Sequence, residues 1–462
     1  MPDIEYLMPD TMFLIPDIYS FLTFACLIKS QSMYIPEKRH YKLQSLHTGK
    51  IFEDTGWVLD PPDGKGPGFV RTIYEKKQIQ LRGEEHGLYT FADWLPVIRE
   101  LKGSSAPVTY KSEGLAASLG LSNLYITFSG YWPEKHAMMS TCSFKETEAY
   151  SVCGRLDPDE DKILVVASAG NTARSFARVC SDNDIPLLLC VPEDFMGALW
   201  FDRPIKDHVK MIVTRAGSDY FDAIHLSNLA CHLDRFIPEG GAKNVARRDG
   251  MGTTVLSAVT TIGEIPEYYF QAIGSGTGAI SAWEANLRLI EDGRFGKRKM
   301  KLMVSQNIPF VPIHDAWKAN SRDILPLHDE LARLQVGEIL AKVLSNRKPP
   351  YAIKGGLFDA MKDAGGDVLL ASNEEALRAM DLFEAEEGID LHPAAAVATA
   401  TLINAVNEGK VDKDALIMLN ITGGGEERFK KDSALHYLQP SLAFDFDPDI
   451  SEVKLKIDKL FY

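Results

Sequence analysis

Short apolar runs alternate with amphipathic stretches along most of the chain after residue 107. The apolar runs, which we predict to be buried strands, lie at residues 124–128, 163–168, 186–191, 209–214, 269–273, 301–305 and 415–421. The amphipathic stretches, which we predict to be helices, lie at residues 171–180, 220–233, 279–290 and 394–406. Buried strands that alternate with helices indicate an α/β fold around mostly parallel sheets. Ligands of such sheets bind in loops where a strand ends and a helix begins.

The first hundred residues lack this alternation. Residues 34–100 are irregular and contain the turn-rich run 61–68. Residues 11–28 are strongly apolar, but acidic residues and no lysine or arginine precede them, unlike in a signal peptide. Pro16 also interrupts this stretch, which is short for a membrane-spanning helix. We therefore predict that residues 1–32 are an over-extended start or a loosely docked tail, with no membrane segment.

Composition and charge narrow the class of protein. Of the 462 residues, 45% are hydrophobic and 25% are charged, which is usual for a soluble globular protein. The chain has 50 basic and 64 acidic residues, so its net charge of −14 does not favour binding to nucleic acid. The six cysteines form no C-x-x-C pair and have no metal-ligand spacing. We therefore predict no metal site and a reducing, cytoplasmic compartment.

Lys145 is the first residue that carries chemistry. It follows the hydroxyl-rich run 140–143 at the start of a helical stretch. A lysine in this position can be partly desolvated, which lowers its pKa and makes its amine nucleophilic enough for a Schiff base. Taken alone, a lysine here is more simply a solvated residue of a helix's first turn. Its assignment depends on the loops that accompany it.

Three further loops lie at predicted strand ends. Residues 168–172, Ser-Ala-Gly-Asn-Thr, open a helix and offer main-chain amides and side-chain donors to an anion, although an ordinary helix cap explains them equally well. Residues 274–278, Gly-Ser-Gly-Thr-Gly, let the backbone approach a phosphate. Their spacing is not that of a dinucleotide site, and Gln306 stands where an acid would bind a ribose, so we prefer a single phosphate. Residues 421–425, Ile-Thr-Gly-Gly-Gly, are by themselves a glycine-rich turn.

In this order, the four segments resemble the fold-type II pyridoxal-phosphate enzymes, and among them the threonine-synthase-like group. S-F-K at 143–145 resembles the Schiff-base motif, and S-A-G-N-T at 168–172 resembles the loop that meets the ring hydroxyl and the substrate carboxylate. G-S-G-T-G at 274–278 resembles the cofactor phosphate loop, and I-T-G-G-G at 421–425 resembles the segment that meets the pyridine nitrogen. The resemblance covers about residues 100–435.

The resemblance implies a fold like that of the tryptophan synthase β-subunit, with two open α/β domains, mostly parallel sheets and the cofactor between them. We expect a catalytic region at 101–462, in which a smaller lobe at about 140–250 is inserted in the larger lobe. We expect residues 33–100 to be a metal-free remnant of a ribbon that carries paired cysteines in relatives. We also expect a homo-oligomer.

The implied site residues follow from the matched motifs. Lys145 is expected to be catalytic and to bind pyridoxal 5'-phosphate. The other expected cofactor contacts are Asn171, Gly274, Ser275, Gly276, Thr277, Gly278 and Thr422. Ser168, Thr172 and Arg247 are expected to bind the substrate, and Arg174 and Arg248 are weaker candidates, more simply surface ion pairs.

Departures from the group's motifs indicate the substrate. The usual motif continues S-F-K-D-R-G, whereas Lys145 is followed by Glu-Thr-Glu. In the stretch 244–253, the group's N-P-Y-R-x-E-G-Q-K-T keeps its arginine as Arg247, but its lysine is replaced by Gly252. Within the threonine-synthase-like group, the chain most resembles the enzymes of methanogenic archaea that form L-cysteate from O-phospho-L-serine and sulfite on the way to coenzyme M. Three segments carry this resemblance: T-C-S-F-K-E, F-A-D-W-L-P at 91–96 and A-S-A-G-N-T-A-R.

Three alternatives stay open at this point. A threonine synthase acting on O-phospho-L-homoserine would use the same cofactor, and a pocket discriminates one methylene by only about 1–3 kcal/mol. A non-catalytic cofactor-binding relative would keep the fold without turnover. A dinucleotide-dependent oxidoreductase is the most distant alternative.

Overall fold

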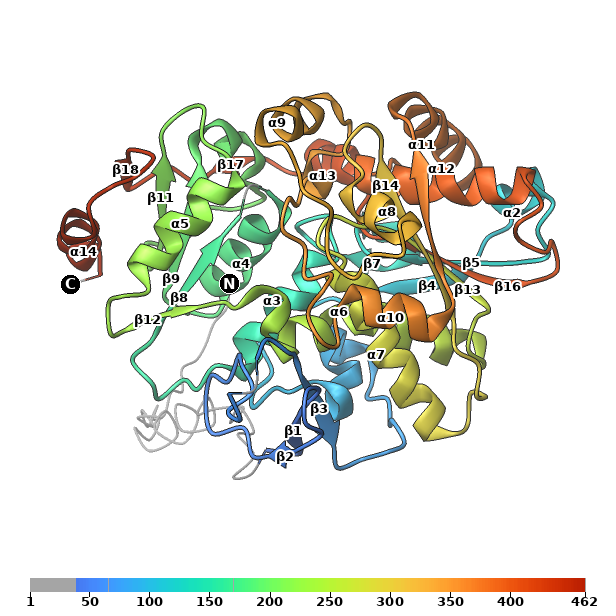
Figure 1. Ribbon diagram of the computed structural model, residues 1–462, viewed down its shortest axis with the longest axis horizontal. Coiled ribbons are helices and arrows are strands. Elements are labelled where there is room, and N and C mark those ends of the chain that lie inside the picture. Colours follow the sequence, from blue (N-terminus) through green and yellow to red (C-terminus); the bar gives the residue numbers. More distant parts are fainter. Residues whose placement is uncertain (1–38, 65, 169, 462) are drawn as a thin grey trace, which may run out of the picture.

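Two sheets, each in a lobe of its own, organise the chain in the computed structural model, which describes residues 39–64, 66–168 and 170–461 (Figure 1). The prediction for residues 1–32 lies outside the described residues. The larger lobe contains a six-stranded sheet in the order β15-β14-β13-β16-β5-β4, in which only the β4–β5 pair is antiparallel. Its strands are β4 (Val108–Lys111), β5 (Asn123–Phe128), β13 (Tyr268–Ala272), β14 (Lys301–Asn307), β15 (Asp367–Ala371) and β16 (Leu416–Ile421).

Helices cover both faces of this sheet, which explains why its central strands β13, β14 and β16 are buried along almost their whole length. One face packs against α6, α7, α8 and α10, and the other packs against α2, α11 and α12. The bounds are α2 (Gly114–Leu119), α6 (Val245–Ile262), α7 (Thr277–Asp292), α8 (Pro312–Lys318), α10 (Leu357–Ala364), α11 (Asn373–Glu387) and α12 (Pro393–Asn407). The exposed helix α9 (Asp329–Glu338) lies in the segment between α8 and α10.

The smaller lobe contains a fully parallel five-stranded sheet in the order β12-β8-β9-β11-β18. Its strands are β8 (Ile163–Ala167), β9 (Leu187–Pro192), β11 (Val209–Thr214), β12 (Phe236–Pro238) and β18 (Leu442–Phe444). Helices α3 (Lys145–Arg155) and α4 (Asn171–Asp182) pack on one face, and α5 (Tyr220–Ala230) and α14 (Ile450–Asp458) pack on the other. The C-terminal segment thus returns to the edge of this lobe, at the far left of Figure 1.

The α/β fold class and the seven predicted strands are confirmed, and the four predicted helices correspond to α4, α5, α7 and α12. The sequence patterns missed β4, β12, β15 and β18. Two of these strands, β12 and β18, have only three residues each, which is too short for a periodic pattern. The short pairs β6 (Tyr131–Trp132) with β7 (Ala137–Met138) and β10 (Trp200–Phe201) with β17 (His436–Tyr437) were also missed.

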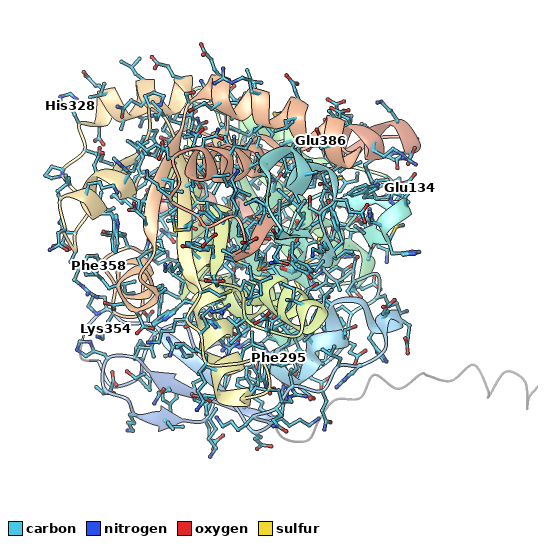
Figure 2. All side chains as sticks on the ribbon, turned by 90° about the vertical axis from the view of Figure 1, so that its right-hand side faces the viewer. Glu134, Phe295, His328, Lys354, Phe358 and Glu386 are labelled. Carbon is cyan, nitrogen blue, oxygen red and sulfur yellow. The ribbon has the colours of Figure 1, made fainter. Side chains whose placement is uncertain are left out.

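An antiparallel ribbon precedes the lobes. Its strands are β1 (Tyr41–Ser45), β2 (Ile51–Phe52) and β3 (Val70–Tyr74), in the order β2-β1-β3. The ribbon is fixed to α6, because the hydroxyls of Thr72 and Tyr74 donate to Asp249. Phe69 N donates to Lys354 O at 3.0 Å, and Figure 2 shows Lys354 beside the ribbon. Among residues 39–64, 66–168 and 170–461, no group of three or more His, Cys, Asp or Glu is placed to hold a metal. No helix in this part of the chain is long and apolar enough to cross a membrane.

Helices α3 and α6 join the two lobes. Gly250 of α6 lies so close to α3 that an added Cβ would be 2.5 Å from the carbonyl oxygen of Thr147. This contact requires glycine, because any larger side chain would separate the helices. The crossing places Arg247, at the start of α6, beside the first turn of α3.

Candidate active site

The loop before Lys145 lies against the end of β16. Ser143 pairs with Gly423 in an antiparallel bridge, and Phe144 N donates to Thr422 O at 3.0 Å. An added Cβ on Gly423 would lie 2.9 Å from the carbonyl oxygen of Cys142. The glycine run after Thr422 therefore allows two main chains to approach, and it places Lys145 beside the 421–425 loop that the sequence indicated.

Lys145 is the first residue of α3, and its side chain is mostly buried. Its Nζ lies 3.3 Å from Glu148 Oε2, one helical turn further on, and 4.8 Å from the centre of the Phe144 ring. Burial lowers the pKa of the Lys145 ammonium; Glu148 opposes this shift and Arg247 adds to it. A lowered pKa increases the fraction of the lysine that is present as the neutral amine, which a Schiff base requires.

Glu148 is fully buried and has further partners on two other helices. Its Oε1 accepts from Thr172 Oγ1 of α4 at 3.1 Å and lies 3.3 Å from Arg247 Nη2 of α6. Arg247 also donates through Nε and Nη2 to the two carboxylate oxygens of Glu239, both at 2.7 Å. We call Lys145, Glu148, Thr172, Glu239 and Arg247 the ionic cluster.

Two members of the ionic cluster, Glu148 and Glu239, were not predicted as site residues. Glu148 occupies the position of the glycine in the S-F-K-D-R-G motif, and its i+3 spacing from Lys145 could have indicated a shared helix face. Glu239 directly follows β12, which the sequence patterns also missed. The neighbouring Glu146 has a different role, because it accepts from Thr141 N at 2.9 Å and Oγ1 at 2.8 Å.

Arg247 keeps one unused donor group. Its Nε and Nη2 are occupied by carboxylates, whereas Nη1 has no hydrogen-bond partner in the described part of the chain. Glu148 and Glu239 therefore orient this arginine and offset its positive charge. The two weaker candidates are buried, Arg174 against Thr141 O and the Trp200 ring, and Arg248 against Glu284. Their contacts fit structural roles.

Asn171, the first residue of α4, is oriented by Arg174. Arg174 Nη2 donates to Asn171 Oδ1 at 3.0 Å. The side-chain nitrogen of Asn171, Nδ2, therefore points the other way and lies 3.4 Å from His392 Nε2. His392 Nδ1 accepts from Ala394 N at 3.2 Å as the cap of α12. Burial lowers the pKa of His392 to about 4, so the ring is neutral and carries its one proton on Nε2. Two donors therefore face each other without an acceptor between them.

The loop Gly274–Gly278, which we call the phosphate loop, connects β13 to α7. The amides of Gly274, Ser275, Gly276 and Gly278 donate to no acceptor among the described residues. Gly276 has φ +78°, and the hydroxyls of Ser275 and Thr277 lie 2.8 Å apart. Unpaired amides at the start of a 16-residue helix favour a bound anion.

The remaining predicted residues, Ser168 and Thr422, are both buried. Ser168 Oγ accepts from Gly170 N at 3.3 Å, so it shapes its own loop at the end of β8. Thr422 accepts from Phe144 through its main-chain oxygen, and its hydroxyl has no hydrogen-bond partner in the described part of the chain.

This set of groups fits pyridoxal phosphate. The cofactor presents an aldehyde for a lysine amine, a ring oxygen for donors, a ring nitrogen and a phosphate. Lys145 supplies the amine, and the donors of Asn171 and His392 lack the acceptor that a ring oxygen would supply. The free hydroxyl of Thr422 and the unpaired amides of the phosphate loop match the other two groups.

Comparisons with known proteins agree with this fit. The family "Pyridoxal-phosphate dependent enzyme" matches residues 128–423. Cysteate synthase of Methanosarcina barkeri is 49% identical over 90% of this chain and 100% of that protein. Cysteate synthase of Methanosarcina acetivorans is 49% identical over 84% of this chain and 93% of that protein. A solved structure of maize serine racemase covers 71% of this chain and 91% of its own, with a TM-score of 0.53 and 13% identity, which shows the fold alone.

Proposed function

The chain belongs to the pyridoxal-phosphate dependent enzymes and, within them, to the cysteate synthase family, and we propose that it makes L-cysteate from O-phospho-L-serine and sulfite. The predicted family, fold class and cofactor are confirmed. The observation that carries the proposed activity is the amine of Lys145, held with a lowered pKa where the 168–172 and 421–425 loops meet. We place the reaction on the route to coenzyme M.

We assign the cofactor contacts as follows. Lys145 binds the cofactor covalently, the phosphate loop binds the phosphate, and Asn171 holds the ring oxygen with His392 as a second donor. Thr422 offers the ring nitrogen a neutral hydroxyl in place of a carboxylate. A neutral partner favours elimination at Cβ over transamination, because the ring is less cationic.

Bound pyridoxal phosphate supplies a ring that accepts the electron pair left on Cα when the substrate loses its proton. The amine of Lys145, once displaced by the substrate, takes that proton as the general base. The Cβ–O bond then breaks, and phosphate leaves with the bonding pair. A lone pair on the sulfur of sulfite forms the Cβ–S bond, and Lys145 returns the proton to Cα.

Both the leaving phosphate and the incoming sulfite are anions, so one cationic position can serve both steps. We assign this role to the free Nη1 of Arg247, which Glu239 and Glu148 hold in place. The substrate carboxylate is assigned to the hydroxyl of Ser168 and to the amides at the start of α4, that of Thr172 among them, which have no partners within the helix. The hydroxyl of Thr172 donates to Glu148 instead.

The test is product analysis together with absorbance. Phosphoserine alone should change the visible cofactor band, and added sulfite should restore the band while cysteate and phosphate accumulate. Turnover of phosphohomoserine to threonine would instead establish a threonine synthase. A cofactor-bound protein that converts neither substrate would establish a non-catalytic relative, and a requirement for a nicotinamide nucleotide would establish an oxidoreductase.

We also propose a cytoplasmic homo-oligomer, on the basis of the sequence features given above. Light scattering of the purified enzyme measures the assembly.

A further inference from the structure

We propose that Glu148 is a positioning residue that receives and holds the amine of Lys145 whenever this amine is not bonded to the cofactor. The inference rests on the proposed function, in which Lys145 alternates between a covalent bond to the cofactor and a free amine. In the structure the free amine lies 3.3 Å from Glu148 Oε2. Glu148 is one turn along the same helix, so it stays within reach of Lys145 throughout the reaction.

The carboxylate of Glu148 is fixed from two other directions. Thr172 of α4 donates to its Oε1 at 3.1 Å, and Arg247 of α6 lies 3.3 Å from the same oxygen. Its other oxygen, Oε2, faces Lys145. One oxygen of Glu148 therefore anchors it to the protein, and the other is available to the amine.

The charged and titratable groups around the amine determine its proton affinity. Burial and the guanidinium of Arg247 lower the pKa of Lys145, whereas Glu148 and, more weakly, Glu239 raise it. Tyr220 lies near the same carboxylates, and burial raises the pKa of its phenol, so it adds no negative charge at neutral pH. Glu148 is thus the carboxylate that contacts Lys145 and counteracts the lowering of the lysine pKa by burial.

This arrangement suits a base that must hold a proton and then return it. When the neutral amine takes the Cα proton, the electron pair of the C–H bond stays with the substrate and the lysine becomes an ammonium. The ammonium then faces a fixed carboxylate, which stabilises it while phosphate leaves and sulfite adds. Glu148 itself touches neither substrate nor cofactor in this scheme, since it acts through Lys145.

The experiment measures the amine directly in full-length protein from which the cofactor has been removed. An amine-reactive ester is applied between pH 6 and 10, and labelling of the Lys145 peptide is followed by mass spectrometry. Glu148→Gln should move the midpoint of labelling to lower pH by about one unit, so that labelling at pH 7 becomes about tenfold faster. Glu146→Gln is the matched control, because Glu146 is equally buried and bonds Thr141 instead of Lys145; its midpoint should equal that of the wild type.

A folded Glu148→Gln protein with an unchanged midpoint overturns the proposal. If this variant does not fold, Glu148→Asp keeps the charge and shortens the side chain, and its midpoint should move in the same direction by a smaller amount. An unchanged midpoint there also overturns the proposal. In the cofactor-loaded enzyme, the rise of kcat with pH should begin at lower pH in Glu148→Gln, because the amine must be neutral to accept a proton. Labelling needs no substrate, so failure of the proposed reaction and failure of this inference are distinguishable.

Discussion

The ionic cluster and the phosphate loop, both assigned to the proposed cofactor site, differ in the groups that they offer to a ligand. The ionic cluster consists of four charged side chains and the hydroxyl of Thr172, which contact one another, as in the double contact between Arg247 and Glu239. The phosphate loop consists of main-chain amides without partners. In the ionic cluster, Lys145 must leave Glu148 to bond to the cofactor. In the phosphate loop, an anion can bind to the amides without breaking a hydrogen bond within the protein. We therefore assign the chemistry to the ionic cluster and the retention of the cofactor to the phosphate loop.

The largest expected effect comes from removing the amine of the ionic cluster. Lys145→Ala should abolish the visible cofactor band and lower turnover by on the order of 10³-fold or more, because both covalent binding and the general base are lost. Absorbance and cysteate production measure the two losses. Lys243→Ala, at an exposed lysine paired with Asp60, is the control and should behave as wild type. Normal turnover by Lys145→Ala would remove the ionic cluster from the chemistry.

The next effect tests the phosphate loop. Gly276 and Gly293 lie at opposite ends of α7 with φ +78° and +79°, so alanine at either position should cost about 1 kcal/mol in backbone strain. Only at Gly276 would the new Cβ meet a neighbour, the Leu357 side chain at 2.6 Å. Gly276→Ala should therefore raise the cofactor dissociation constant about tenfold, about 1.4 kcal/mol. Fluorescence titration measures this constant, and equal cofactor affinity in the two variants would contradict the assignment of the loop.

A third variant separates orientation from charge within the ionic cluster. Arg247→Ala should raise KM for phosphoserine about tenfold, since a hydrogen bond to a charged group contributes about 1.5–3 kcal/mol. Arg247→Lys keeps the charge without the planar fork that Glu239 holds, so its KM should be intermediate. Steady-state kinetics measure both values, and an unchanged KM in folded Arg247→Ala would exclude this arginine from the substrate site.

The smallest effect concerns His392. Its Nε2 faces the side-chain nitrogen of Asn171, whereas Arg174 bonds the side-chain oxygen of the same residue. His392→Asn preserves an acceptor for the cap of α12 but removes the Nε2 donor, so cofactor affinity should fall about three- to tenfold with little loss of stability. His392→Ala should show the same loss of affinity and a further destabilisation of about 1 kcal/mol from the lost cap. Thermal unfolding and cofactor titration separate the two effects. If His392→Asn binds the cofactor as tightly as the wild type, His392 does not donate to the ring oxygen and Asn171 is its remaining assigned donor.

The same contrast explains what could be predicted from the sequence. The phosphate loop is one continuous stretch with a glycine pattern, so both its position and its expected ligand could be predicted from the sequence. The ionic cluster unites residues from α3, α4, α6 and the end of β12, and only the fold brings them together. Lys145 and Arg247 were indicated by motif resemblance, but Glu239 lies in no motif. His392 was missed because its role depends on a tautomer, which a cap bond in the folded chain determines.

The return of the C-terminal segment to the smaller lobe has a consequence for how the chain is made. Strand β18 pairs with β11, and the neighbouring Arg215 and Asp445 are 230 residues apart in the sequence. At roughly 5–20 residues per second, a ribosome needs about 10–50 s to synthesise that interval. During this time the β11 edge lacks its final strand, and an unpaired edge is a template for aggregation. Slower initiation or a chaperone that covers this edge should therefore raise the yield of folded enzyme, and a truncation before β18 should lower it.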